Sequence, residues 1–328
     1  MRIQVGVIGV GADWETRRLP ALRAVPDRFE VRAVCDSVGH RAEHAARTLG
    51  ADAHDGFHAL INRSDVEAVM MYNNDWFGAL PIFAACEAGK GIYCAAALEL
   101  RDEEAAVLRD RVRDAGVAFM AEFPCRLSPA TLRLKELIAT KLGKPKLLFC
   151  NRRQLSGSTN GVQEPCSLDL IELIDWCRYM VDDEPTSLVA SMHRGGGGNS
   201  DYFSVSLDFS QVGEVGVGPL AVIACGEYVA PMYEESLAYR RPADMKVVCE
   251  RGIAFLDLPS TLIWFNEAGQ HLERLDHERP VGEQMLLHFH RAVESLVLKT
   301  ASLEDAHRAI AIANKARQSA VTGQRAFL

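Results

Sequence analysis

The chain has 328 residues, of which 48% are hydrophobic and 24% are charged. This mixture is ordinary for a soluble globular protein and disfavours disorder, and the length predicts two domains rather than one. The formal net charge is −8 at pH 7, and no stripe rich in Lys or Arg offsets it. Binding to nucleic acid is therefore disfavoured, and we expect a small-molecule substrate or a protein partner.

The location of the protein is indicated by its cysteines and its first residues. The nine cysteines are scattered and form no C-x-x-C pair. The opening residues run directly into a strand pattern and lack the basic start and cleavage site of a signal peptide. No apolar stretch approaches the ~20 residues needed to span a bilayer. We expect a reduced, cytoplasmic protein without a membrane segment, whose cysteines pack in the core.

The first 124 residues alternate between strand and helix patterns. An apolar run at 2–8 ends in the tight turn Gly9-Val10-Gly11. Further strands are expected at 29–35, 68–72, 91–94 and 117–121, and helices at 17–25, 39–49, 78–88 and 102–115. This alternation predicts a parallel, doubly wound sheet of the Rossmann type over residues 1–124.

Beyond Pro124 the pattern changes to successive period-two runs. Such runs predict an α+β domain over residues 125–328, built on an open and mostly antiparallel sheet. The four glycines 195–198 lack the Lys-Ser/Thr of a phosphate loop and predict a mobile hairpin tip. Strands are expected near 145–153, 186–193, 202–209, 221–229, 244–250, 253–256 and 262–266, and helices at 129–140, 167–181, 283–298 and 302–321.

The turn after the first strand has the spacing of a dinucleotide-binding loop. Gly9 and Gly11 would let backbone N–H groups approach a pyrophosphate at a helix N-terminus. Asp36 follows the second strand, where an acid binds the ribose diol. The third glycine is replaced by Trp14, or by Asp13 if the gap shifts, which predicts a weaker pyrophosphate grip. Two glycines alone could form a plain turn, but their order with the strands and the acid favours a nucleotide site.

A second motif has a plain alternative reading. Residues His40 to His44 spell H-x-x-E-H, by which a helix presents two zinc ligands and a base in inverted zinc peptidases. The same letters arise on the solvated face of a Rossmann helix, and no third ligand is evident. We therefore expect no metal site, and a zinc hydrolase is the minor alternative. The pairs His54 with His58 and His288 with His290 are expected at the surface or in packing.

Short motifs are spread along nearly the whole chain. They are LPAL (19–22), EVRAVCD (30–36), EAGK (87–90), RLSP (126–129), KELI (135–138), LGKPKLL (142–148), HFHRAVES (288–295), SLEDAHRAIAIANKA (302–316) and SAVTGQ (319–324). These motifs resemble, in order, the landmarks of the Gfo/Idh/MocA oxidoreductases, the family of glucose–fructose oxidoreductase and inositol dehydrogenase. The resemblance implies NAD or NADP as the cofactor, a sugar, inositol or polyol as the substrate, and association through the open sheet into a homodimer or homotetramer.

The departures from this family fall on its chemical positions. Ala96 stands where the resemblance places the catalytic lysine, and Glu172 stands where it places the histidine, with Asp175 three residues later. The family's Thr-Pro becomes Asn73-Asn74, and a following His becomes Gly78. An alanine cannot accept a proton, so the usual base is absent. The sequence leaves open an enzyme with non-standard residues and a nucleotide-sensing or structural protein without catalysis.

We expect the catalytic role, if there is one, to fall on Glu172. Its neighbour Asp175 lies one helical turn away and would raise its pKa toward neutrality, and Arg126 would hold an anionic or hydroxyl-rich substrate. In the plain alternative both acids solvate a helix face or pair with arginines.

The cofactor is expected to be NAD rather than NADP. Asp36 would accept hydrogen bonds from a free ribose hydroxyl and repel a 2′-phosphate, although Arg41 could reach such a phosphate. The residues expected at the cofactor are Gly9, Gly11, Asp13, Trp14, Asp36, Ser37, Arg41, Asn73, Asn74, Trp76 and Ala96.

Overall fold

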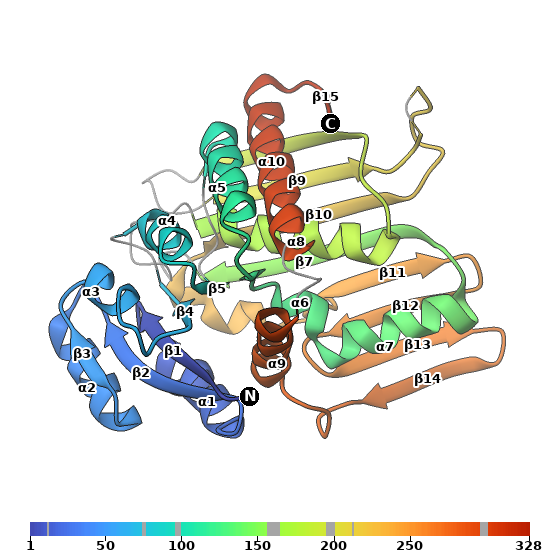
Figure 1. The fold of residues 1–328 in the computed structure, drawn as a ribbon. Helices are drawn as coiled ribbons and strands as arrows, with labels where there is room; N and C mark the ends of the chain where they lie inside the picture. The colour runs from blue at the N-terminus through green and yellow to red at the C-terminus, as the bar shows by residue number, and fades with distance from the viewer. Residues whose placement is uncertain are drawn as a thin grey trace. The chain divides into compact units, whose positions relative to one another are not determined.

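The computed structural model describes residues 1–11, 13–73, 77–95, 100–155, 165–194, 201–211, 213–295 and 301–328 (Figure 1). The chain forms two compact units. The first comprises Met1–Pro124 and Arg279–Arg308, and the second comprises Cys125–Glu278 and Ala309–Leu328.

The first unit is built on a six-stranded sheet in the order β3-β2-β1-β4-β5-β6. Every neighbouring pair runs parallel. This order is that of the dinucleotide-binding Rossmann fold, so the predicted fold of this unit is confirmed. The short, polar β3 was missed, because three residues show no period-two pattern. The strands are β1 (Ile3–Ile8), β2 (Phe29–Cys35), β3 (Asp52–His54), β4 (Ala68–Met71), β5 (Gly91–Cys94) and β6 (Phe119–Ala121).

Local signals fix the ends of the helices in this unit. Helix α5 begins after Arg101, where a capping box with Glu104 satisfies backbone N–H groups, and it ends at Gly116 with a positive φ. Helix α2 likewise ends at Gly50, with φ of 68°. The helices are η1 (Trp14–Arg18, a π-helical turn), α1 (Leu19–Ala24), α2 (Gly39–Leu49), α3 (Phe57–Ile61), α4 (Leu80–Glu87), α5 (Asp102–Ala115) and α9 (Val281–Glu294).

Helix α9 returns to the first unit from late in the chain. Phe289 stacks on Phe29 at 6.1 Å between ring centroids and meets Tyr93 edge-on at 5.4 Å. The sequence analysis assigned all of 125–328 to the second domain, whereas residues 279–308 pack with the first. An amphipathic pattern predicts that a helix has an apolar face, but not which surface covers that face.

The second unit is built on a nine-stranded sheet in the order β14-β13-β12-β11-β7-β10-β9-β8-β15. Neighbouring strands run antiparallel except β7 and β10, so the mostly antiparallel prediction is confirmed. The polar β14 and the two-residue β15 were missed. The strands are β7 (Pro145–Leu155), β8 (Ser187–Arg194), β9 (Asp201–Asp208), β10 (Leu220–Val229), β11 (Met245–Cys249), β12 (Gly252–Asp257), β13 (Thr261–Asn266), β14 (Gly269–Arg274) and β15 (Ala326–Phe327).

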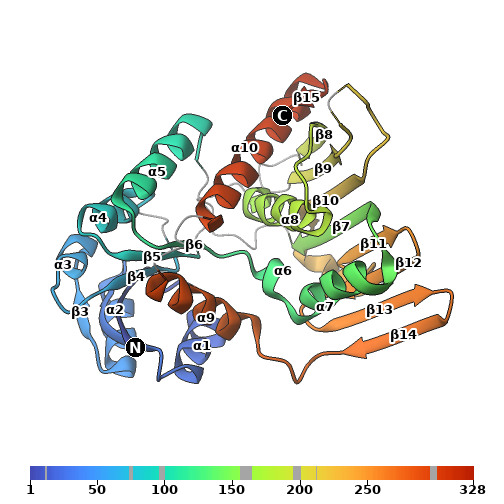
Figure 2. The same ribbon diagram turned by 45° about the vertical axis from the view of Figure 1, so that its right-hand side comes forward.

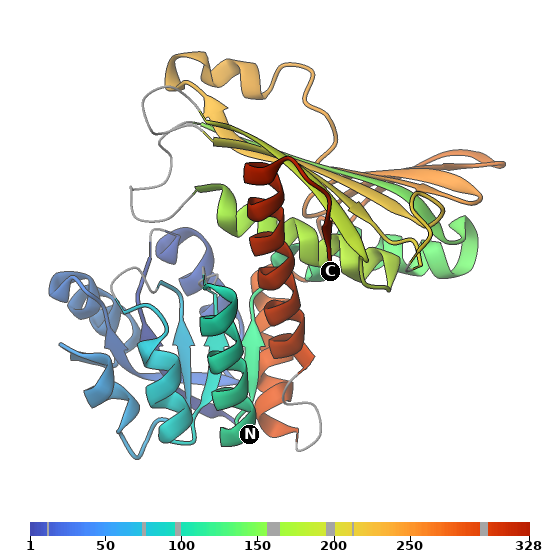
Figure 3. The same cartoon turned by 90° about the horizontal axis from the view of Figure 1, so that it is seen from above.

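Helices α7 and α8 cover one face of this sheet, as Figures 2 and 3 show. Alternate residues of β7, such as Leu148 and Cys150, are buried, whereas Leu147 is 38% exposed on the opposite face. Ser128 caps α7 by accepting a hydrogen bond from the Thr131 N–H. The helices of this unit are α6 (Pro124–Leu127), α7 (Pro129–Leu137), η2 (Ile138–Leu142), α8 (Pro165–Val181), η3 (Pro231–Leu237) and α10 (Ala301–Thr322), whose first residues belong to the first unit.

Within the described ranges, no helix combines the length and the apolarity that crossing a membrane requires.

Candidate functional site

The glycine turn of the first unit is shaped for close backbone approach. Gly9 has φ of 72°, and a Cβ at this position would lie 2.0 Å from the carbonyl oxygen of Asn73. Packing against the segment that follows β4 therefore requires glycine there. Gly11 has φ of 71°, and a Cβ there would make ordinary van der Waals contacts, the nearest with the Asp13 carboxylate at 3.6 Å. Steric crowding therefore requires the first glycine, and the left-handed backbone conformation favours the second.

Asp36 lies directly against this turn. Its carboxylate accepts hydrogen bonds from the Val10 N–H at 2.7 Å and the Val38 N–H at 2.8 Å, and the residue is 6% exposed. The ribose-type acid at the end of β2 is thus fixed beside Gly9 and Gly11. Ser37 is exposed beside it. Arg41 is exposed near the start of α2, and its side chain makes no hydrogen bond or ion pair with the described residues.

Trp14 and Asp13, which were expected to contact the cofactor at the third-glycine position, both have partners within the protein. Trp14 is 3% exposed and packs 5.9 Å from the Tyr72 ring, so it is a core residue rather than an open surface for a cofactor. The Asp13 carboxylate lies 3.1 Å from Arg18 and 3.7 Å from Arg17. The negative charge of Asp13 is therefore offset by two cations.

Glu122, which follows β6, is the centre of a buried charge cluster. Its N–H donates to the carbonyl of Cys94 at 2.8 Å, and its side chain is 2% exposed. Arg17 and Arg18 both donate to this carboxylate. Burial and the negative charge of Glu122 hold the pKa of Tyr93 well above its ordinary value. The sequence does not predict this cluster, because Arg17 and Arg18 lie more than a hundred residues from Glu122 along the chain.

Glu172 on α8 is held by two donors. Its carboxylate accepts from the Cys125 N–H at 2.9 Å and from Arg152 at 2.8 Å, and Arg152 also binds Asp169 at 2.5 Å. Burial by itself would raise the pKa of Glu172, but Arg152 and the Cys125 N–H outweigh it and lower that pKa below its ordinary value. The expected rise toward neutrality is therefore wrong, because the arginine on β7 could not be seen from the helix alone.

Asp175 does not act as a partner carboxylate for Glu172. It is fully buried and accepts two hydrogen bonds from Arg126, at 2.5 and 2.6 Å, and one from Arg178 at 3.5 Å. Arg126 is thus committed to a bidentate ion pair, which corrects the expectation that it is available to hold a substrate. The plain alternative, in which both acids pair with arginines, describes Glu172 and Asp175 here.

The remaining predicted site residues lie outside the described residues or at the surface. Asn74, Trp76, Ala96 and the glycines 195–198 lie outside the described residues. His44 is exposed, and its ring nitrogen lies 3.7 Å from Glu15. In the part of the chain that the structure describes, no group of three or more His, Cys, Asp or Glu side chains could hold a metal ion.

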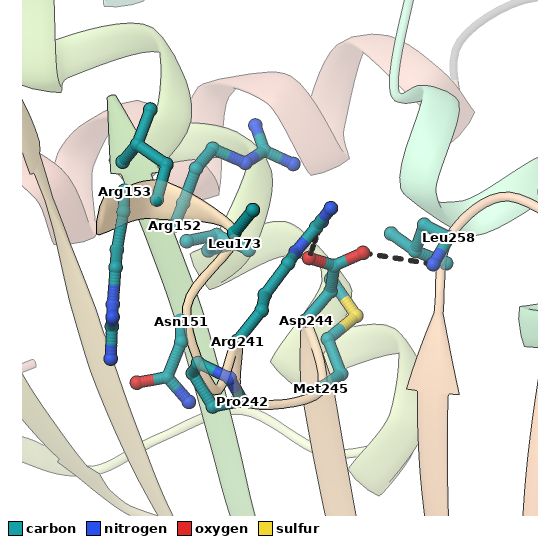
Figure 4. A pocket seen from close by; sticks show the side chains of 11 residues that line it. Asn151, Arg152, Arg153, Leu173, Arg241, Pro242, Asp244, Met245 and Leu258 are labelled. Carbon is teal, nitrogen blue, oxygen red and sulfur yellow. Dashed lines mark hydrogen bonds and ion pairs between the residues drawn. The ribbon is translucent and has the colours of Figure 1, made fainter. Parts of the chain in front are cut away.

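The second unit contains a cavity of about 480 Å³ at the end of β7 (Figure 4). Asn151, Arg152 and Arg153 line it from β7. Arg241 and Asp244 line it from the segment before β11, and Asp244 accepts hydrogen bonds from Arg241 at 2.5 Å and from a backbone N–H at 2.9 Å. The sequence does not predict this cavity, because β7 and the segment before β11 lie far apart along the chain and give no local signal of a shared lining.

Comparisons with known proteins agree with this architecture. A family model described as an oxidoreductase family with an NAD-binding Rossmann fold matches residues 3–123. Inositol 2-dehydrogenase 3 of Saccharopolyspora erythraea is 30% identical over 195 residues, which cover 57% of this chain and 56% of that protein. D-xylose 1-dehydrogenase (NADP(+)) 2 of Haloferax volcanii is 30% identical over 139 residues, 42% of each. The chain thus spans about half the length of the curated relatives it matches.

Among solved structures, the aldose-aldose oxidoreductase from Caulobacter crescentus complexed with glycerol has a TM-score of 0.85. The two chains are 14% identical and match over their full lengths, so the similarity concerns the fold of both units. A putative myo-inositol dehydrogenase from Sinorhizobium meliloti has a TM-score of 0.78 at 20% identity, with 99% of each chain covered. The sequence of residues 3–123 thus matches the Gfo/Idh/MocA oxidoreductase family, and the two units have the fold of these solved structures.

Proposed function

We propose that the protein is an NAD-dependent oxidoreductase acting on a sugar or polyol derivative, with catalytic residues that differ from the family pattern. The observation that carries this proposal is the Asp36 carboxylate fixed 2.7 Å from the Val10 N–H, between two glycines whose φ angles are positive. These groups fit a dinucleotide: the turn would hold its pyrophosphate and Asp36 its ribose. Sugar and polyol dehydrogenases among the relatives support the substrate class.

The cofactor choice is testable by calorimetric titration of the full chain with NAD and with NADP. We expect NAD to bind more tightly, because Asp36 is buried and negatively charged where a 2′-phosphate would lie. Arg41→Gln serves as the matched variant, since this arginine is exposed and near Asp36 in sequence. Tighter binding of NADP that disappears in the Arg41→Gln variant would contradict the assignment.

The acid–base role is proposed for Glu172, with a different electrostatic basis from the sequence argument. Its lowered pKa keeps it ionised at neutral pH, so it would act as a proton acceptor that Arg152 orients. Arg126 and Asp175, which bind each other, would position α8 rather than contact substrate.

A nucleotide-binding protein without catalysis is the second candidate. It is favoured by the neutralisation of Glu122, Glu172 and Asp175, each of which is held by arginines. Mass spectrometry of nucleotide retained from expression, followed by incubation with sugars and polyols, separates the two. Bound NAD that is never reduced by any of them supports the second candidate.

A homo-oligomer is proposed through the uncovered face of the nine-stranded sheet. This face presents Leu147 at 38%, Val189 at 37% and Leu272 at 56% exposure, whereas the opposite face is packed under α7 and α8. A second copy offers the same apolar surface, which suits an isologous interface. We expect a dimer or tetramer in sedimentation velocity, and dissociation when Leu147 is replaced by Glu. A monomer at micromolar concentration would contradict this proposal.

A further inference from the structure

The lining of the cavity at the end of β7 carries an excess of positive charge. Of its described lining residues, Arg152, Arg153 and Arg241 carry positive charge and Asp244 alone carries negative charge. Asp244 is already bound to Arg241 and to the backbone N–H of Leu258. The guanidinium groups therefore meet no further carboxylate within this lining.

The three arginines are held to different degrees. Arg152 is bound by Asp169 and Glu172, which lie on α8 and are not among the lining residues. Arg241 has a side chain 61% exposed and donates to Asp244 through one nitrogen. Arg153 is exposed, and its side chain makes no hydrogen bond or ion pair with any residue that the structure describes. Figure 4 shows Arg152 and Arg153 leaving β7 in different directions, with Arg241 between the strand and Asp244.

Apart from Asn151, the remaining wall is apolar, with Leu173, Leu237, Ala238, Pro242, Met245 and Leu258. A volume of about 480 Å³ suits a ligand of monosaccharide size. Planar guanidinium groups pair best with a carboxylate, to which they donate two parallel hydrogen bonds. An apolar wall beside such donors fits a sugar ring that carries one acidic group.

We propose that this cavity binds the carboxylate of a sugar acid, such as a hexuronate, through Arg153 and Arg241. The identification of that sugar acid as the substrate rests on the proposed oxidoreductase function. The binding itself does not, because every residue that forms the cavity belongs to the second unit.

The test is calorimetric titration of the full chain, without nucleotide, with D-glucuronate and with D-glucose, which differ at C6 alone. We expect glucuronate to bind more tightly than glucose by roughly 10- to 100-fold, the range for hydrogen bonds to a charged group. Arg153→Gln and Arg241→Gln should each remove most of this difference. Arg274→Gln, an exposed charge change in the same unit and outside the cavity, should preserve it.

Equal binding of glucuronate and glucose would overturn the proposal, as would an equal loss in the Arg153→Gln and Arg274→Gln variants. Tighter binding of glucose 6-phosphate than of glucuronate would also overturn it, in favour of a phosphate ligand. Glucuronate that binds through Arg153 but is not oxidised with NAD would uphold the site and contradict its redox role. The two proposals therefore fail separately.

Discussion

Replacing Glu172 by Gln is expected to lower turnover by about 10²- to 10⁴-fold once a substrate is known, with NAD affinity unchanged. The amide keeps the shape of the side chain and its contact with the Cys125 N–H, but it cannot accept a proton. Because Arg152 and the Cys125 N–H lower the pKa of Glu172 below its ordinary value, the wild-type protein should stay active as the pH falls from neutral into the mildly acidic range. Steady-state kinetics across this pH range measures both effects.

Two variants separate catalysis from loss of structure. Asp169→Asn removes the other acidic partner of Arg152 and leaves Glu172 intact, so it should preserve most of the turnover. Glu136→Gln changes an exposed acid on α7 and should have no effect. Full activity in Glu172→Gln would remove Glu172 from the mechanism. An equal loss in Asp169→Asn would show that Arg152, rather than proton transfer, explains the result.

Replacing Asp175 by Asn is expected to destabilise the second unit by about 3–5 kcal/mol, because Arg126 then loses its buried counter-charge, while Arg178 keeps Glu184. Asp175 is fully buried and receives both hydrogen bonds of the Arg126 fork, with Arg178 at 3.5 Å. Chemical denaturation followed by tryptophan fluorescence measures the change, since the buried Trp176 is adjacent in sequence. The midpoint of thermal unfolding should fall by on the order of 10 °C.

Asp182→Asn is the matched control for this measurement. Its side chain is 90% exposed and its nearest cation, Lys135, lies 3.8 Å away, so solvent screens the pair and the unfolding midpoint should not move. Similar shifts in the two variants would show that the Arg126–Asp175 pair contributes nothing specific. An unchanged NAD affinity in Asp175→Asn would agree with a role confined to the second unit.

Most of the helices and strands, and the outline of the nucleotide-binding turn, could be predicted from the sequence alone. Helices α2 and α5 lie at the predicted residues, because capping and glycine termination act within a few positions along the chain. The order of strands around Gly9 and Asp36 followed from alternating patterns, and right-handed crossovers left few topologies to consider. The resemblance to one family rested on motifs spread along the chain, each short enough to read locally.

Which acidic and basic side chains form ion pairs depends on the tertiary structure and could not be predicted. Arg126 and Asp175, which form an ion pair, are 49 residues apart in the sequence. Glu122 accepts a hydrogen bond from Arg17, which is 105 residues away in the sequence. The distances in these pairs depend on how strands and helices come together, and the pKa of each acid depends on those distances. For the same reason the sequence suggested a raised pKa for Glu172, where Arg152 lowers it. The residue types thus indicate which chemistry a chain can support, whereas long-range packing sets the protonation state of each titratable side chain.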